Sequence, residues 1–438
     1  MAEAAVPVRS DAFRPAYQWY ALGVLFLVYV CNFIDRSILS ILLQPIKEDL
    51  HVSDTALGFL GGLAFAVFYT ALGIPIARLA DKGVRRNILA VCLVIWSAMT
   101  ALCGLVQSFA QLLACRIGVA VGEAGGSPPS HSMISDMFPQ QRRATALGIY
   151  ALGIPVGTMF GYLLGGWINE VLSWREAFML VGVPGVLLAA VVRFSLREPP
   201  RGVSEPVRPL TDAAPPIGTV FRVLWQRRSF RWMAIGAGFQ AFTGYGSGAW
   251  IPAMFERSHH LSSGDIGVAL FWLGVPSIAG TFLGGWCCDL FGRRDTRAYV
   301  LLPAWITLAA VPFAVYAYLG ADPTLAFIAL IVPNLFGNFW IAPTFSLTQG
   351  LVALRMRAVA ASIILFVLNI IGLGLGPQCV GIASDLLNHY TSLGTASLRW
   401  ALVLSLTLNF VATFCYIRAA RTLGDDLASS QRIPEPIG

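Results

Sequence analysis

The chain has 438 residues, of which 56% are hydrophobic and only 12% charged, with a formal net charge of +7. A soluble domain carries about a quarter charged residues, so this composition leaves too little polar surface to coat a water-soluble globule. The mean hydropathy of +0.69 and the recurring runs of about 20 apolar residues indicate an all-α polytopic membrane protein.

Taken in chain order, the apolar runs predict twelve transmembrane helices. Their expected bounds are 17–46, 55–80, 88–107, 110–137, 143–170, 175–196, 230–256, 264–290, 297–319, 323–350, 356–386 and 397–419. The first run has no small-residue cleavage site and is too long for a signal sequence, so we expect it to remain as the first spanning helix.

One long polar segment interrupts the apolar runs and is rich in proline and arginine. It separates six predicted spans from six. The expected organisation is a six-helix bundle, a cytoplasmic linker, a second six-helix bundle and a cytoplasmic tail, at residues 1–196, 197–229, 230–421 and 422–438.

Lysine and arginine are distributed unevenly between the two sides of the predicted bundle. They gather at both termini, in the linker and in alternate loops such as "DKGVRR" and "GRRDTR". Cytoplasmic loops carry this excess, so both termini are expected in the cytoplasm. The topology accounts for the net positive charge, and no nucleic-acid partner is needed to explain it. The compact loops and the preference for arginine over lysine are typical of a bacterial chain, hence of an inner-membrane protein.

Two of these loops share a pattern and indicate an internal repeat. After the second predicted span the chain reads "ARLADKGVRR", and after the eighth it reads "GGWCCDLFGRR". Each stretch has an aspartate at a helix end, then a tight turn and paired arginines. Parallel repeats of this kind build alternating-access carriers around a midplane site, so two pseudo-symmetric halves are expected.

At these loops the sequence resembles the major facilitator superfamily (MFS), whose GxxxDxxGRR motif the second copy matches from Gly285 to Arg294. The first copy departs from the motif, with Ala77 in place of the glycine and the turn glycine shifted to Gly83. The resemblance implies the MFS fold and a cytoplasmic latch between aspartates and arginines at helix ends. The latch residues carried over in this way are Asp81, Arg85, Arg86, Asp289, Arg293 and Arg294.

Further stretches resemble the spinster-like transporters of single-chain lipids, within the same superfamily. They are "NFIDR" in the first span, "RIGVAVGEAGGSPPSHSMISDMFPQQRR" across the fourth span and its loop, "GIPVGTMFGYLLGG", "SWREAF" and "GLGLGPQCVGIASD". Carriers of organic anions and sugar acids share the N-x-x-D-R and GEA elements. The resemblance therefore implies lipid transport first and transport of a small organic anion as the alternative.

Four charged residues fall within the predicted spans of the N-terminal half, where each charge is costly. Asp35 and Arg36 are neighbours about 100° apart on a helix, so they need different partners. Arg116 and Glu123 are seven residues apart and share one helix face, about 10.5 Å apart along the axis. We expect these two acids and two bases to form one buried cluster, which is either a static ion-pair network or a substrate and ion site.

The spinster resemblance assigns proton coupling and cavity electrostatics to the residues that match Asp35, Arg36 and Glu123 here. A carboxyl group in a cavity of low dielectric has a raised pKa, and a neighbouring arginine lowers it again. The hypothesis is that Asp35 and Glu123 load and release protons. Arg36 and Arg116 would bind an anionic head group and tune those acids.

The C-terminal half carries almost no charge at midplane depth. Pro333 and Pro343 are placed to break the tenth span, which is tolerated beside protein or a watery cavity. Aromatic and amide residues of this half are expected to line a largely apolar wall of the substrate cavity: Tyr245, Asn338, Phe339, Trp340 and Asn369. A charged half facing an apolar half suits an amphiphile with an anionic head and a long tail.

The predicted function is proton-coupled transport of a single-chain anionic lipid or similar amphiphile, such as a lysophospholipid or sphingosine phosphate, by alternating access. The alternatives are a proton-coupled carrier of a small organic anion and a non-transporting lipid sensor of the same fold. No P-loop, HExxH, GxSxG or metal-ligand spacing occurs, so we expect no enzyme activity, no metal and no cofactor besides protons. The superfamily resemblance implies a monomer.

Overall fold

The structure is a computed structural model that describes residues 13–201 and 216–431. Within these ranges the regular secondary structure is helical throughout, as the composition predicts. The side chain of Asp81 lies outside the described part, so its predicted latch role has no structural counterpart here.

In the described part of the chain, ten segments are long and apolar enough to cross a membrane. They correspond to ten of the twelve predicted spans. The other two predicted spans are also helical. Residues 110–137 form two shorter helices, α5 and α6, with a break at Ala124–Gly126, and residues 230–256 lie within one long but less apolar helix, α11.

The described chain divides into two compact units. Of the described residues, unit 1 comprises 13–39 and 68–201, and unit 2 comprises 40–67 and 216–431. Residues 40–67, which cover the second part of the first helix and the first part of the second predicted span, group with unit 2. The expected division into bundles at the linker stays a prediction.

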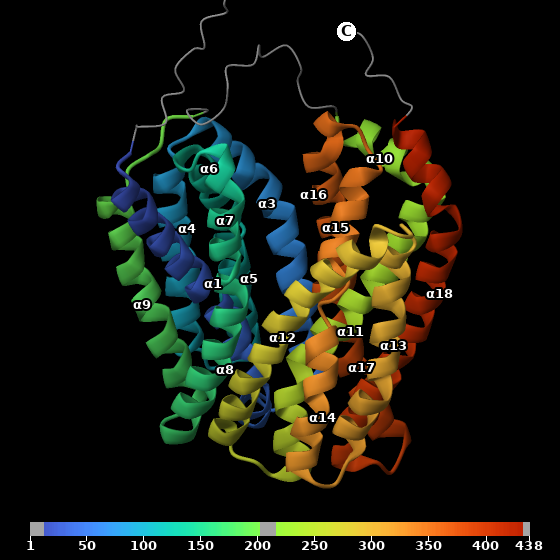
Figure 1. The fold of residues 1–438 in the computed structure, drawn as a ribbon. Helices are drawn as coiled ribbons and strands as arrows, with labels where there is room; N and C mark the ends of the chain where they lie inside the picture. Colours follow the sequence, from blue (N-terminus) through green and yellow to red (C-terminus); the bar gives the residue numbers. More distant parts are fainter. Residues whose placement is uncertain (1–12, 202–215, 432–438) are drawn as a thin grey trace, which may run out of the picture. The chain divides into compact units, whose positions relative to one another are not determined.

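Unit 1 is built around α4 (Arg85–Cys103). This helix packs against α5 (Phe109–Glu123) on one side and α9 (Trp174–Ser195) on another. Glycines permit the close approach, since a Cβ on Gly122 would lie 2.6 Å from the Trp96 nitrogen and one on Gly182 would lie 2.5 Å from the Ala101 nitrogen. The other helices of the unit, drawn in Figure 1, are the first part of α1 (Pro15–Leu50), most of α3 (Ala64–Lys82), α6 (Ser127–Met137), α7 (Gln140–Ala151) and α8 (Gly153–Val171).

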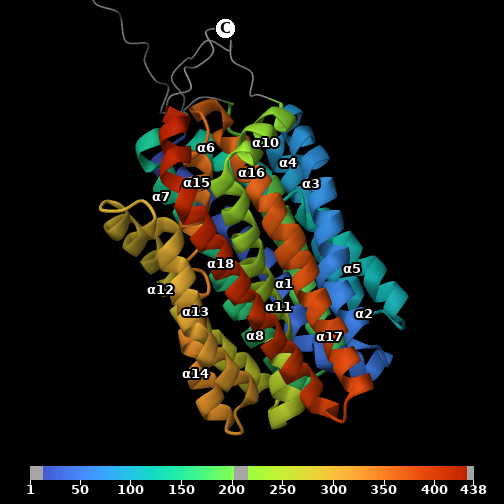
Figure 2. The same cartoon turned by 90° about the vertical axis from the view of Figure 1, so that its right-hand side faces the viewer.

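Unit 2 is built around α11 (Arg228–His259) and α18 (Ser397–Gln431), which pack along each other and run side by side in Figures 1 and 2. The helix α18 continues well past residue 421, where the cytoplasmic tail is expected to begin. Around this pair lie α2 (Asp54–Gly58), α10 (Ile217–Gln226), α12 (Ser263–Gly292), α13 (Ala298–Leu319), α14 (Pro323–Phe336), α15 (Ile341–Gly350), α16 (Arg357–Leu368) and α17 (Gly376–Tyr390).

Three interruptions of regular helix occur in unit 2. The tenth predicted span breaks into α14 and α15, with a turn at residues 337–340 between Pro333 and Pro343, which confirms the predicted break. Two π-helices, η1 (Phe59–Leu63) and η3 (Asn369–Leu375), pack against each other. π-Helical turns are rare and are frequent at functional sites. The sequence analysis missed both, although each is glycine-rich ("FLGGL" and "NIIGLGL").

Candidate functional site

The four charged residues predicted to cluster do so in unit 1. Arg36 Nε donates to Glu123 Oε2 at 2.6 Å, joining α1 to the end of α5. The guanidinium of Arg36 also lies over two aromatic rings, 5.1 Å from the centroid of Phe33 and 4.7 Å from that of Tyr69. Arginine stacks on aromatic faces and pairs with carboxylates, so this setting fits arginine rather than lysine.

Asp35 points away from Arg36 and takes a different partner, as its helical position requires. Its Oδ2 accepts a hydrogen bond from Thr100 Oγ1 of α4 at 3.2 Å. Arg116 reaches the same place from α5, where its Nη1 donates to the backbone oxygen of Asp35 at 3.3 Å. The sequence analysis missed Thr100, because nothing in a lone threonine within an apolar span marks it as the partner of a carboxylate.

Burial makes this cluster chemically unusual. Asp35, Arg116 and Glu123 are each at most 2% exposed, whereas the Arg36 side chain keeps 19% of its surface exposed. The second oxygen of Glu123, Oε1, is buried and accepts no hydrogen bond from the described residues. A buried carboxylate oxygen without a donor disfavours the ionised form. The cluster therefore combines a buried carboxyl that accepts through one oxygen only with an arginine whose side chain is partly exposed.

The first predicted latch loop is tied down inside unit 1. Arg85 is buried and donates to the carboxylates of Asp136 and Glu198 and to the Ser132 hydroxyl. Its neighbour Arg86 donates from its backbone nitrogen to Glu198 at 2.9 Å. The structure thus brings both predicted arginines to acids that the sequence analysis did not single out.

The second predicted latch loop is arranged differently. Asp289 is exposed and accepts a hydrogen bond from the Tyr299 hydroxyl at 2.8 Å. Arg293 and Arg294 are exposed, and their side chains make no hydrogen bond or ion pair with any residue that the structure describes. Among the described residues, the Asp289 carboxylate therefore makes no bond with the side chain of Arg293 or Arg294, and the latch role of this copy stays a prediction.

The residues predicted to line an apolar wall lie in several different settings in unit 2. Asn338 donates to Ser277 at 2.9 Å, whereas Phe339 and Trp340 are packed inside at 2% and 6% exposure. Tyr245 is 44% exposed on α11, and Asn369 begins the π-helix η3. The binding role of these five residues stays a prediction.

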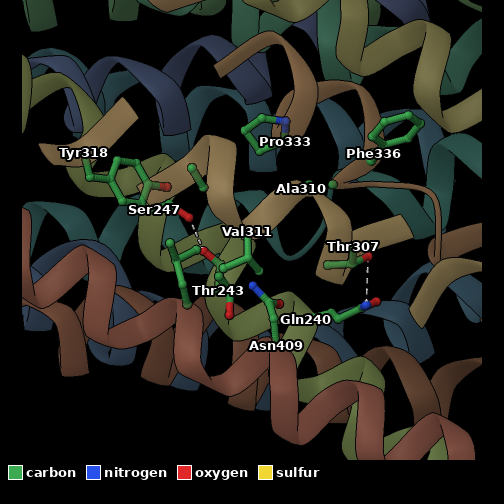
Figure 3. A pocket seen from close by; sticks show the side chains of 14 residues that line it. Gln240, Thr243, Ser247, Thr307, Ala310, Val311, Tyr318, Pro333, Phe336 and Asn409 are labelled. Carbon is green, nitrogen blue, oxygen red and sulfur yellow. Dashed lines mark hydrogen bonds between the residues drawn. The ribbon is translucent and has the colours of Figure 1, made fainter. Parts of the chain in front are cut away.

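A cavity of about 80 Å³ lies inside unit 2 between α11, α13, α14 and α18. Its fourteen lining residues are all uncharged (Figure 3). Gln240 donates to Thr307 across it at 3.0 Å. Asn409 is 5% exposed, and its amide makes no hydrogen bond with the residues described. The cavity has room for a few water molecules or a small neutral group.

A second buried ionic cluster, which we call the Asp54 clasp, lies within unit 2 and was missed by the sequence analysis. Asp54 is 2% exposed and accepts hydrogen bonds from Lys47 at 2.6 Å and from Arg257 at 2.7 and 2.8 Å. Ser384 donates to the same carboxylate at 2.7 Å, and Asp385 accepts from the backbone nitrogens of residues 54 and 55. The clasp thus joins the 40–67 segment to α11 and α17.

Comparisons with known proteins agree with this architecture. The Major Facilitator Superfamily profile matches residues 25–377. An MFS-type efflux pump of Mycolicibacterium smegmatis is 33% identical over 97% of this chain and 97% of its own. A sphingosine-1-phosphate transporter of Xenopus tropicalis is 26% identical over 94% of this chain and 82% of its own.

A solved structure shows the same fold. The crystal structure of a bacterial homologue of the human lysosomal transporter spinster, in an inward-facing and unoccupied conformation, superposes with a TM-score of 0.86. It is 31% identical, and the match covers 94% of this chain and 99% of that one. The chain therefore belongs to the major facilitator superfamily: it is a multi-pass membrane transporter rather than an enzyme, and it is similar to the spinster transporters.

Proposed function

We propose that this chain is a proton-coupled transporter of a single-chain anionic lipid or similar amphiphile that works by alternating access as a monomer. Both termini would lie in the cytoplasm and the helices in the inner membrane. The observation that carries the proposal is the buried cluster of Asp35, Arg36, Arg116 and Glu123. Glu123 is paired with Arg36 through one oxygen only, and its buried second oxygen accepts no hydrogen bond from the described residues, which a network that served only to fix the helices would not require.

In this proposal Arg36 has two competing partners. It bonds to Glu123 when the site is empty, and its exposed edge is available to the anionic head of a substrate. A head group that draws Arg36 away removes the charge that keeps Glu123 ionised, so Glu123 takes up a proton. Loss of the head group reverses both steps. Substrate and proton binding would thus be linked through one guanidinium.

The amphiphilic substrate class is supported by the contrast between the charged cluster of unit 1 and the uncharged cavity of unit 2. The charged cluster lies in unit 1, whereas the cavity of unit 2 is lined only by uncharged residues. The spinster-like fold and a relative whose name assigns it sphingosine-1-phosphate point in the same direction.

Alternating access further requires contacts that form and break on one side of the protein. The Asp54 clasp is a candidate for this role, because it lies at the end of α11 remote from its start at Arg228. Under the proposed topology that end is the exofacial one. The clasp would hold the exofacial side closed and open when the carrier faces outward.

The test is a proton-flux assay on protein reconstituted into liposomes with a trapped pH dye. A lysophospholipid below its micellar concentration is added outside, in parallel with sphingosine phosphate and with a small organic acid. The proposal predicts lipid-dependent proton movement in the wild type and none with Glu123→Gln. The control variant is Glu48→Gln, which changes an exposed acid of the same helix as Arg36 and should keep wild-type flux.

The outcomes separate the alternatives. Flux with the organic acid alone would move the protein to the organic-anion class. Specific lipid binding with no flux would identify a sensor. Lipid flux that Glu123→Gln leaves unchanged in its pH dependence would show that the coupling site is elsewhere.

A further inference from the structure

The short helix α10 (Ile217–Gln226) has two apolar faces, and only one of them packs on protein. Val220 and Leu224 are fully buried in a core cluster of unit 2. On the adjacent face Ile217, Phe221 and Trp225 are 55%, 44% and 49% exposed. Large apolar side chains that recur at this spacing form one stripe along a helix, so the exposed face is continuous.

The stripe is preorganised rather than a scatter of mobile side chains. The rings of Phe221 and Trp225 are stacked, with centroids 5.5 Å apart and planes at 18°. The buried face fixes the rotation of the helix, because Val220 and Leu224 are anchored beneath it. The third side of α10 carries Arg222 and Gln226, both exposed. The helix therefore has one side packed on protein, one exposed apolar side and one exposed polar side.

The position of α10 places the stripe at the depth where the spanning helices begin. It ends at Gln226 and α11 starts at Arg228, with one residue between them. Its buried face shares a core cluster with Phe230 of α11 and Leu423 of α18. Figures 1 and 2 both show α10 at the end of unit 2 where α11 begins and α18 ends. At ten residues it is about 15 Å long, too short to cross a bilayer.

Positive charge accompanies the stripe. Arg222 and Arg228 are exposed, and their side chains make no hydrogen bond or ion pair within the described chain. The guanidinium group matches phosphate geometry, and arginine next to a membrane surface is attracted to anionic lipids. An apolar stripe flanked by unpaired arginines is the pattern of a helix that lies in the membrane interface.

We propose that α10 is an interfacial helix that binds anionic phospholipid. Ile217, Phe221 and Trp225 insert at the boundary between head groups and acyl chains. Arg222 and Arg228 contact lipid phosphates. The linker is thereby held to the bilayer where it enters the C-terminal helices, and this site is separate from any transported lipid.

The first test locates Trp225 in the bilayer. The full-length protein is reconstituted with phosphatidylcholine brominated either near the head group or deep in the chain, and tryptophan fluorescence is compared between wild type and Trp225→Phe. The difference in fluorescence between the wild type and Trp225→Phe is the contribution of Trp225. The proposal predicts that bromines near the head group quench this contribution more than deep bromines do, and that aqueous iodide quenches it little. Strong iodide quenching would place the stripe in water. If neither the brominated lipids nor iodide quench this fluorescence, protein covers Trp225, whether residues 202–215 or a second copy. Strong iodide quenching and the absence of quenching would each overturn the proposal.

The second test measures the lipid preference. The melting temperature of the purified protein is recorded with added phosphatidylglycerol and with added phosphatidylcholine. Phosphatidylglycerol should raise it more in the wild type, and the double variant Arg222→Gln/Arg228→Gln should lose at least half of that difference. Arg297→Gln, which removes an exposed arginine of the α12–α13 loop, is the control and should keep it. An equal response in all three proteins would contradict the proposal. A variant that melts at a lower temperature than the wild type without lipid has a folding defect. For this reason only the shift that lipid causes within each protein is compared.

Discussion

The Arg36 side chain donates a charge-assisted hydrogen bond to Glu123 and stacks over two aromatic rings. It also remains partly exposed. The ion pair is worth little as a source of stability, because taking both charges out of water offsets their attraction. In the proposed mechanism the pair matters because the protonation of Glu123 changes when Arg36 leaves it, and this change couples protons to substrate.

This view of the pair predicts a rescue. Arg36→Gln leaves Glu123 buried without its cation and should destabilise the protein by about 3–5 kcal/mol, the usual result of breaking a buried pair from one side. Adding Glu123→Gln removes the stranded charge and should restore most of the melting temperature, while transport stays lost. Thermal unfolding of the two single variants and the double variant measures this. If the loss of stability in the double variant equals the sum of the losses in the two single variants, the two residues act independently.

Thr100 allows the protonation of Asp35 in the same cluster to be changed without removing a charge. Its hydroxyl stabilises the ionised form of the Asp35 carboxylate, and a hydrogen bond to a charged group is worth about 1.5–3 kcal/mol. With Thr100→Val, protonation of Asp35 becomes easier. The pH profile of lipid-driven proton flux should therefore move upward by about one unit. Thr100→Ser keeps the hydroxyl and should keep the wild-type profile, and a profile unchanged in both would remove Asp35 from the coupling machinery.

At the scale of helices, the glycines of α12 that make close contacts are not the glycine of its sequence motif. The motif glycine, Gly285, is not tightly packed, since a Cβ there would meet only the Ala342 Cβ at 3.8 Å. The tight positions are Gly280 and Gly284, where a Cβ would lie 1.5 Å from the Leu335 oxygen and 2.6 Å from the Phe339 oxygen. Small residues at such positions let helix backbones approach closely.

The helix contact yields a matched pair of variants. Gly280→Ala forces α12 away from α14 and should lower the melting temperature markedly, by the several degrees that a loss of about 2 kcal/mol or more produces. Gly285→Ala, the equivalent change at the motif glycine, should stay close to wild type. Thermal unfolding in one detergent compares them. Equal melting temperatures would mean that the α12–α14 contact relaxes without cost.

The Asp54 clasp gives an element-scale prediction of its own. Asp54→Asn removes the charge that holds Lys47 and Arg257, so the 40–67 segment should open more often from α11 and α17. Hydrogen exchange of backbone amides in residues 54–63 should quicken at least tenfold, which corresponds to about 1.4 kcal/mol. Glu48→Gln lies on the same segment outside the clasp and should exchange like wild type. Unchanged exchange with Asp54→Asn would show that packing of the π-helices alone holds the segment.

At the scale of the whole chain, patterns that depend on composition and helical period were predictable from the sequence. The all-helical membrane fold, the superfamily and the break near Pro333 follow from hydropathy, motifs and proline chemistry. The shared face of Arg116 and Glu123 follows from their spacing on a helix. These features are local, or nearly so, along the chain.

What the sequence did not reveal depends on contacts between segments far apart in the chain. Thr100 and Asp54 look ordinary within their own helices, and only the fold places one beside Asp35 and the other beside Arg257. The assignment of residues 40–67 to the C-terminal unit is of the same kind. Burial of Phe339 and Trp340 also depends on which helix faces them, and an aromatic side chain alone does not disclose that.

The central claim is that Glu123 links proton movement to substrate movement, and gradient-driven accumulation tests it most directly. Liposomes containing the wild type or Glu123→Gln are given an imposed pH gradient or none, and uptake of a labelled lysophospholipid is followed with and without lipid preloaded inside. The wild type should redistribute lipid against its gradient when the pH gradient is imposed. Glu123→Gln should still exchange lipid across the membrane but fail to accumulate it. Accumulation by Glu123→Gln equal to that of the wild type would show that Glu123 does not link the two movements.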